Sequence, residues 1–124
     1  ESQYFKSKPT VYIVEVLHVM RFHVFLPGDF VTLPGEVASE MFFVNKGIVS
    51  VFAPTGPHCE SISDATLLKT MKRGDHFGEV ALFWDCTRWA WVRADTYSLL
   101  SVLQRSKIEP IWRHFPQERI SLRV

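Results

Sequence analysis

Hydrophobic and polar residues alternate in short runs along most of the chain, and this period of two predicts β-strands. In residues 21–26, which read RFHVFL, every second residue is large and apolar. Further predicted strands occupy 30–33, 40–47, 48–53, 65–72, 88–95 and 96–103. Strands of this length between glycine turns are typical of a barrel or jelly roll rather than a βαβ sheet, and about eight of them are predicted.

The connections between these runs carry residues that favour turns. Residues 27–29 (PGD), 34–36 (PGE) and 73–75 (RGD) are predicted tight turns, because glycine adopts positive φ readily and proline fixes φ. The Asn45-Lys46-Gly47 stretch predicts a hairpin between strands 40–47 and 48–53. Residues 54–64 have the composition of a surface loop.

A helix is predicted at residues 10–20, ahead of the first strand. Val11, Val14 and either Leu17 or His18 fall at the spacing of one helical face. Thr10, which follows a proline, is the expected N-cap.

Two helices are predicted after the last strand. The first runs through 106–115, with Ser106 as N-cap, Glu109 three residues later, and Pro110 only partly tolerated inside it. The second opens at Pro116 and continues to Val124.

Composition places the chain among folded globular proteins and excludes several functions. Of the 124 residues, 47% are hydrophobic and 14% aromatic, and the formal net charge of +1 gives no attraction toward nucleic acid. Cys59 and Cys86 are too few for a disulfide framework and match no metal motif, which indicates free thiols in a reducing compartment. No apolar run is long enough to span a membrane. Because the sequence starts without Met, we interpret it as part of a longer protein.

Catalytic and metal sites are not predicted. His76 and Glu79 lie three residues apart, but the His-x-His pair of a cupin-like metal site is missing. Ser98 and Ser101 have no visible His-Asp partners, so acyl-transfer chemistry has no support and the protein is not expected to be an enzyme.

Residues 74–97, GDHFGEVALFWDCTRWAWVRADTY, contain the candidate binding site. A short helix over 78–83 would present backbone N–H groups to an anion, and Gly78 would allow that backbone to approach the ligand closely. Arg88 could pair with a phosphate, and Glu79 could accept a hydrogen bond from a sugar hydroxyl. The structural alternative is a turn glycine, a capping carboxylate and a surface arginine.

Three segments taken together resemble the cyclic-nucleotide-binding domain. They are residues 25–51, with LPGD, GE and MFFVNKG; residues 68–83, LKTMKRGDHFGEVALF; and residues 88–97, RWAWVRADTY. The runs VRADTY and HFPQER resemble the domains of hyperpolarisation-activated and cyclic-nucleotide-gated cation channels in particular. The resemblance covers roughly residues 5 to 122. It implies an eight-stranded antiparallel β-roll with an N-terminal helix, a short helix in a phosphate-binding cassette, and two C-terminal helices of which the last is truncated.

The resemblance also implies roles for individual residues of the cassette, residues 77–90. Gly78 and Ala81 resemble backbone contacts to the cyclic phosphate and sugar, and Val80 between them belongs to the same ligand-binding set. Glu79 resembles the acceptor of the ribose 2′-hydroxyl, and Arg88 resembles the phosphate arginine.

The chain departs from the family pattern at the residue after that arginine, and in its last helix. In the family, the residue after the arginine is usually small, Thr or Ala, and lines the pocket, whereas this chain has Trp89 at that position. Strand alternation predicts that Trp89 and Trp91 face away from Arg88, Ala90 and Val92 and form an exposed apolar ridge. If Trp89 instead turned inward, it would crowd the ligand. Only the beginning of the helix that closes over the base is present, so base contacts are not assigned.

The implied function is that of a regulatory module of an ion channel. The domain, residues 1–124, is expected to bind cAMP or cGMP, to need no cofactor or metal, and to couple binding to gating of an attached channel. Its expected partners are the cyclic nucleotide and the rest of a channel, through which a homotetramer would form. Nucleic acid is not an expected partner, and this segment is not expected to insert into the membrane. Its expected location is the cytoplasmic face of a membrane. The alternative is a non-binding homology domain that acts as a structural or gating element of a voltage-gated potassium channel.

Overall fold

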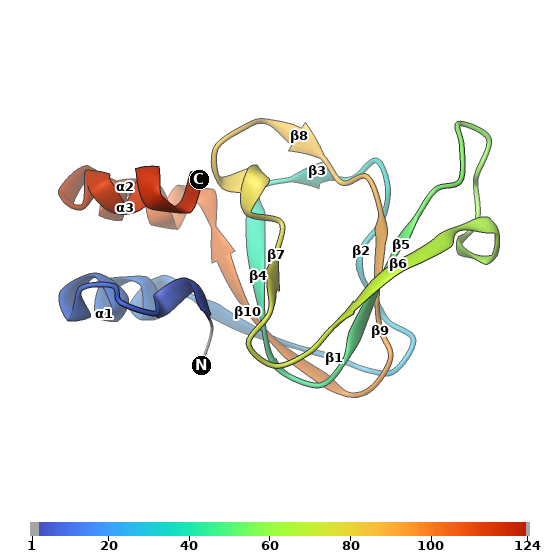
Figure 1. The fold of residues 1–124 in the computed structure, drawn as a ribbon, viewed down its shortest axis with the longest axis horizontal. Helices are drawn as coiled ribbons and strands as arrows, with labels where there is room; N and C mark the ends of the chain where they lie inside the picture. The colour runs from blue at the N-terminus through green and yellow to red at the C-terminus, as the bar shows by residue number, and fades with distance from the viewer. Residues whose placement is uncertain (1–2, 124) are drawn as a thin grey trace.

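The computed structural model describes residues 3–123 and the side chains of residues 4–119. Its helical elements are η1 (Gln3–Phe5), α1 (Thr10–Val19), η2 (Ile62–Asp64), η3 (Glu79–Leu82), α2 (Arg105–His114) and α3 (Pro116–Arg123). Its strands are β1 (Arg21–Phe25), β2 (Phe30–Thr32), β3 (Val37–Ala38), β4 (Glu40–Lys46), β5 (Val49–Ala53), β6 (Thr66–Met71), β7 (His76–Phe77), β8 (Cys86–Thr87), β9 (Trp91–Ala94) and β10 (Ser98–Gln104). The three α-helices lie together at one end of a β-roll (Figure 1).

The strands form two four-stranded sheets, with orders β1-β10-β4-β7 and β2-β9-β5-β6, and a two-stranded ladder of β3 and β8. Every pairing in the described chain is antiparallel. The predicted class, mainly β with flanking helices, is confirmed. Within residues 3–123 there are ten strands rather than about eight, because β3, β7 and β8 are additional strands of only two residues each.

Two hydrophobic cores lie on opposite faces of β4. Met41 and Phe43 pack among the helices, whereas Phe42 and Val44 pack between the two sheets. Because successive side chains of a strand point to opposite faces, a strand covered on both sides reads as a continuous apolar run. The run MFFV therefore identifies the strand that joins the helices to the roll.

The hairpin predicted at residues 45–47 is wrong. β4 pairs with β10 and β7, and β5 pairs with β6 and β9, so the turn carries the chain from one sheet to the other. Gly47 does adopt a positive φ of 95°. A Cβ on it would collide with Ser98 and with the Tyr97 carbonyl, so this glycine also permits close contact with the start of β10.

The predicted helix at 10–20 is present, but its buried face differs from the predicted one. Val11, Val14 and Leu17 are 64%, 45% and 51% exposed. The buried residues are Tyr12 and Val16, one helical turn apart, because the aromatic ring of Tyr12 reaches the core beneath α2.

Both predicted N-caps are wrong. Pro9 occupies the N-cap position of α1, and Thr10 is already the first helical residue. Gln104 precedes α2, whose first residue is Arg105, so Ser106 lies inside the helix. Pro116 does open α3, as predicted, since proline lacks only an N–H that a first helical residue leaves unpaired.

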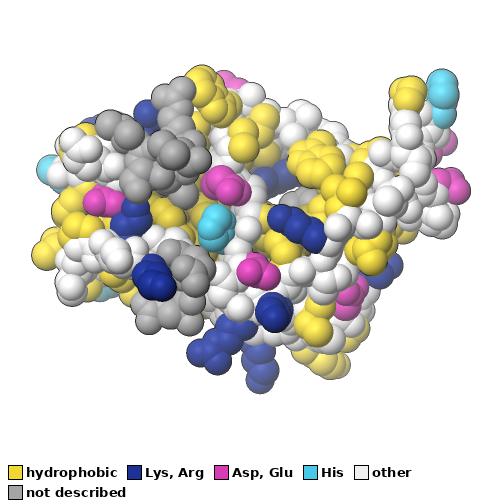
Figure 2. Space-filling model, viewed as in Figure 1, with side chains coloured by type: hydrophobic (Ala, Val, Ile, Leu, Met, Phe, Trp, Pro, Cys, Tyr) yellow, Lys and Arg dark blue, Asp and Glu magenta, His cyan; other side chains and the backbone are white. Residues whose placement is uncertain are grey.

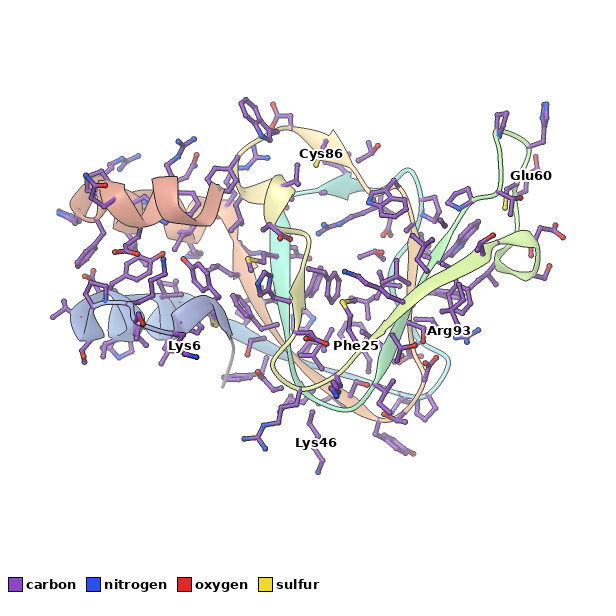
Figure 3. All side chains as sticks on the ribbon, in the orientation of Figure 1. Lys6, Phe25, Lys46, Glu60, Cys86 and Arg93 are labelled. Atoms are coloured by element: carbon purple, nitrogen blue, oxygen red, sulfur yellow. The ribbon has the colours of Figure 1, made fainter. Side chains whose placement is uncertain are left out.

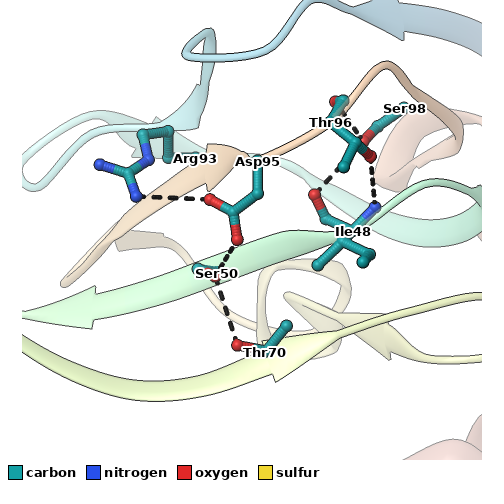
Figure 4. Close-up of polar contacts among 7 residues, drawn as sticks. All are labelled: Ile48, Ser50, Thr70, Arg93, Asp95, Thr96 and Ser98. Atoms are coloured by element: carbon teal, nitrogen blue, oxygen red, sulfur yellow. Dashed lines mark hydrogen bonds and ion pairs between the residues drawn. The ribbon is translucent and has the colours of Figure 1, made fainter.

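A polar cluster joins the strands of the second sheet (Figure 4). The Ser50 hydroxyl on β5 donates to the Asp95 carboxylate and lies 3.3 Å from the Thr70 hydroxyl on β6. Arg93 on β9 donates to the other oxygen of Asp95 at 3.3 Å. These contacts fix the register of the three strands beside the turn after β9.

Candidate functional site

All six residues predicted to bind ligand line one pocket of about 400 Å³. The set is Gly78, Glu79, Val80, Ala81, Arg88 and Trp89. The pocket lies between the inner face of the second sheet and the segment from β7 to β8. Figure 2 shows a hollow near the middle of the molecular surface in view, with basic and hydrophobic side chains at its rim.

The predicted short helix after Gly78 is confirmed as η3. Gly78 has φ 82° and ψ 16°, a left-handed conformation that glycine adopts without strain. The first intrahelical bond runs from the Ala81 N–H to the Gly78 carbonyl, at 3.1 Å. The N–H groups of Glu79 and Val80 precede that bond at the pocket end of η3.

Backbone contacts position Arg88. Its N–H donates to the Glu36 carbonyl and its own carbonyl accepts from the Gly35 N–H, both at 2.7 Å. The turn predicted at 34–36 therefore holds the peptide of Arg88 from both sides. This arrangement aims the side chain into the pocket beneath Gly78.

The guanidinium of Arg88 is half-buried and forms no ion pair with a carboxylate in the described part of the chain. It donates to the Glu40 carbonyl at 2.7 Å and lies 5.4 Å from the Phe42 ring. None of the ion pairs between described residues includes Arg88. Burial lowers the pKa of Arg88, and the negative charge of Glu40 partly opposes that shift. A desolvated cation of this kind is stabilised by an anion that occupies the pocket.

Glu79 projects from the start of η3, with its side chain 39% exposed. Its carboxylate lies 3.9 Å from Nδ1 of His76. That nitrogen is buried and has no hydrogen-bond partner among the described residues. The second carboxylate oxygen remains available to accept a hydrogen bond from a ligand hydroxyl.

Trp89 is 63% exposed, as strand alternation predicts, although residues 88–90 precede β9 rather than belong to it. Ala90 and Val92 lie in the core of the roll on the opposite side. The predicted exposed ridge of Trp89 and Trp91 is wrong, because Trp91 is only 8% exposed. Trp89 is therefore exposed at the edge of the pocket, whereas Trp91 is buried.

The pocket contains polar residues that were not predicted. Lys69 and Thr32 reach it from β6 and β2, His76 from β7, and Cys86 from β8. Figure 3 shows Cys86 at the same end of the roll as η3. Lys69 lies two residues before the buried Met71, so the period of two in this strand was a signal that could have placed it on the inner face.

The arrangement suits an anionic ligand that also carries hydroxyl groups. One arginine, one lysine, the first N–H groups of η3 and one carboxylate converge on a largely apolar cavity. No group of three or more metal-ligating side chains occurs among the described residues. Within residues 3–123, no helix is long and apolar enough to cross a membrane.

The structure is an antiparallel β-roll whose pocket lies at a left-handed glycine, and comparison with known proteins gives the family. The family model for the cyclic nucleotide-binding domain matches residues 22–114. The chain therefore belongs to the cyclic nucleotide-binding domain family.

Curated relatives are cation channels. The chain is 35% identical over 108 residues to potassium/sodium hyperpolarization-activated cyclic nucleotide-gated channel 3 of Homo sapiens, covering 87% of this chain and 13% of the channel. It is 32% identical over 108 residues to channel 4 of Oryctolagus cuniculus, covering 87% of this chain and 8% of the channel. The chain thus spans a small part of the length of these relatives.

Solved structures share the fold at lower identity. Catabolite Activator Protein of Thermus thermophilus superposes with a TM-score of 0.84 at 21% identity, covering 98% of this chain and 55% of that one. The regulatory domain of Toxoplasma gondii PKA, crystallised with cAMP, superposes with a TM-score of 0.79 at 20% identity, covering 96% and 45%.

Proposed function

We propose that this domain binds a cyclic nucleotide, cAMP or cGMP, in the pocket between η3 and the second sheet. The observation that carries the proposal is Arg88, a half-buried cation beside the left-handed Gly78 that pairs with no carboxylate of the described residues. The cyclic phosphate would accept hydrogen bonds from Arg88 and from the first N–H groups of η3. The ribose 2′-hydroxyl would donate to Glu79, and Val80 and Ala81 would contact the sugar.

The proposed role is regulatory rather than catalytic. The channel relatives support a place beside an ion channel, at the cytoplasmic face of a membrane, in a tetramer formed through that channel. Nucleotide would change gating only through different affinities for two arrangements of the C-terminal helices. Such coupling typically amounts to about 1–3 kcal/mol.

A second candidate function is that of a non-binding structural or gating element. The observation that favours it is Trp89, whose large side chain lies at the edge of the pocket. The indole is 63% exposed, which leaves the interior of the pocket to Arg88 and Gly78, so we favour binding.

Titration calorimetry of Arg88→Ala with cAMP and cGMP tests the proposal. Removal of a charge-assisted hydrogen bond worth about 1.5–3 kcal/mol should weaken binding by roughly tenfold to a hundredfold or more. Arg73→Ala is the matched control, because Arg73 is exposed in a turn and does not line the pocket. Its affinity should stay within about twofold of the wild type.

The role of Glu79 is tested in the same titrations with a modified ligand. Glu79→Gln should weaken binding of cAMP but not of 2′-deoxy-cAMP, which lacks the proposed hydrogen-bond donor. Failure of the wild type to bind either nucleotide at millimolar concentration would refute the proposed function. Unchanged affinity in Arg88→Ala would refute the assignment of the phosphate site.

A further inference from the structure

One side chain from α2 reaches the end of η3 that is remote from the pocket. Arg105 is the first residue of α2, and its side chain is 22% exposed. Its Nε donates to the Ala81 carbonyl at 2.8 Å, and its Nη2 donates to the Trp84 carbonyl at 2.5 Å. Its Nη1 pairs with Asp85 at 2.7 Å. One guanidinium therefore binds two carbonyls and a carboxylate at and just after the end of η3.

The position of Arg105 is unfavourable for α2 itself. The N-terminus of a helix carries partial positive charge and favours acidic or capping residues in its first turn. α2 has no acidic residue there and no side-chain cap. The guanidinium instead complements carbonyl groups of η3, so its contribution lies in the contact between the two helices.

Backbone contacts bring Arg105 close to the phosphate arginine. The Arg105 N–H donates to the Ser39 carbonyl at 2.9 Å, and Arg88 donates to the next carbonyl, that of Glu40, at 2.7 Å. Two consecutive carbonyls, at the residue before β4 and at its first residue, thus anchor both arginines. A shift of Arg88 or η3 on ligand binding would reach α2 through bonds that are already formed.

Apolar contacts lie beside this polar link. Leu82 of η3 is 1% exposed and packs in the core formed by the helices. The Phe83 ring stacks on Trp112 of α2 with centroids 5.1 Å apart, and Arg119 of α3 lies 5.1 Å from the Phe83 ring. Figure 1 shows η3 on the side of the roll that faces α2 and α3.

We propose that Arg105 is a positioning residue that holds η3 and α2 together as one unit, so that occupancy of the pocket is transmitted to the C-terminal helices. Its effect on ligand affinity rests on the proposed function, whereas the link between η3 and α2 does not. Arg105 has no contact with the proposed ligand and acts only through η3.

The test compares Arg105→Gln and Arg105→Lys with two controls in the 124-residue chain. Arg105→Lys keeps the charge but cannot reach three acceptors with a planar fork. Lys107→Gln removes an exposed cation from the same helix and controls for long-range attraction of an anionic ligand. Asp85→Asn removes the exposed partner and leaves the carbonyl bonds in place, since the Asp85 side chain is 99% exposed.

The first measurement is hydrogen exchange without ligand. Both Arg105 variants should raise exchange of the amides in residues 79–84 and at the start of α2, whereas neither control should do so. Unchanged protection of these amides in both variants would overturn the link. The exchange measurement needs no ligand, so it tests the link between η3 and α2 even if the wild type binds neither nucleotide. Failure of the wild type to bind would reject only the proposed function.

The second measurement is calorimetric affinity for cAMP and cGMP. Both Arg105 variants should bind about tenfold more weakly, and both controls within about twofold of the wild type. Addition of nucleotide should alter exchange in α2 and α3 of the wild type but not of the Arg105 variants. An equal loss of affinity in Lys107→Gln would assign the effect to net charge and overturn the positioning role. If Arg105→Gln does not fold, Arg105→Lys alone decides both measurements.

Discussion

Substitution of Gly78 by alanine tests the geometry of the pocket most directly. Gly78 has φ 82°, and a non-glycine residue in the left-handed region costs about 1–2 kcal/mol. A Cβ at this position would lie 2.8 Å from Nη1 of Arg88 and 3.3 Å from the Glu40 carbonyl. The arginine must therefore move away from the place where the phosphate is proposed to bind.

Gly28→Ala is the matched control for backbone strain. Gly28 has φ 92°, and a Cβ there would meet nothing within 4 Å. Both variants should lose about 1–2 kcal/mol of unfolding free energy, measured by urea denaturation. Only Gly78→Ala should also lose nucleotide affinity, by about tenfold or more, which corresponds to about 1.4 kcal/mol.

Calorimetry with cAMP and cGMP, beside the urea curves, separates strain from crowding. Wild-type affinity in Gly78→Ala would show that Arg88 does not bind the phosphate from its present position. An equal loss of affinity in Gly28→Ala would show that general strain, rather than the contact with Arg88, controls binding. Either result would refute the reasoning.

Two further predictions concern Trp89 and the buried tyrosines. Trp89→Thr should leave nucleotide affinity within about threefold of the wild type, under ~0.7 kcal/mol, because the indole is 63% exposed. A gain in affinity of tenfold or more, measured by calorimetry, would show that Trp89 blocks the pocket and would favour the non-binding function. Burial raises the pKa of both Tyr4 and Tyr12, whose hydroxyls are hydrogen-bonded to each other. A pKa raised on folding stabilises the protein below the pKa of the unfolded chain, so the unfolding free energy should fall as pH rises above about 10, by up to ~1.4 kcal/mol per pH unit for each tyrosine. Urea curves between pH 9 and about 11 should show a shallower fall for the Tyr4→Phe, Tyr12→Phe double variant than for Tyr97→Phe, whose ring is 69% exposed; equal slopes would contradict this account.

Local conformation could be predicted from the sequence wherever the chain needed no distant partner. The turns at 27–29, 34–36 and 73–75 occur where predicted, and Gly28, Gly35 and Gly74 have positive φ. Turn residues act on their own φ and ψ, so the sequence determines such turns directly. The short helix after Gly78 was predictable for the same reason.

The members of the candidate site could also be selected from the sequence, through the motif in residues 74–97. All six line the pocket, although Gly78 and Arg88 are ten residues apart. The sequence could not show how Arg88 is held, because Gly35, Glu36 and Glu40 come from a part of the chain about fifty residues earlier. The period of two could place Lys69 on the inner face of its strand, but only the strand pairings bring Lys69 and Thr32 to the pocket.

Tertiary structure alone decided which partners each strand and helix would have. The Asn45-Lys46-Gly47 turn fits a hairpin locally, yet β4 and β5 belong to different sheets because β4 must cover both cores. In α1, Val11 and Tyr12 are both apolar enough to face inward. Tyr12 is the buried one, and its hydroxyl accepts a hydrogen bond from Trp112 at 3.2 Å. Local sequence sets the conformations available to a segment, whereas burial against residues far along the chain determines which one is used.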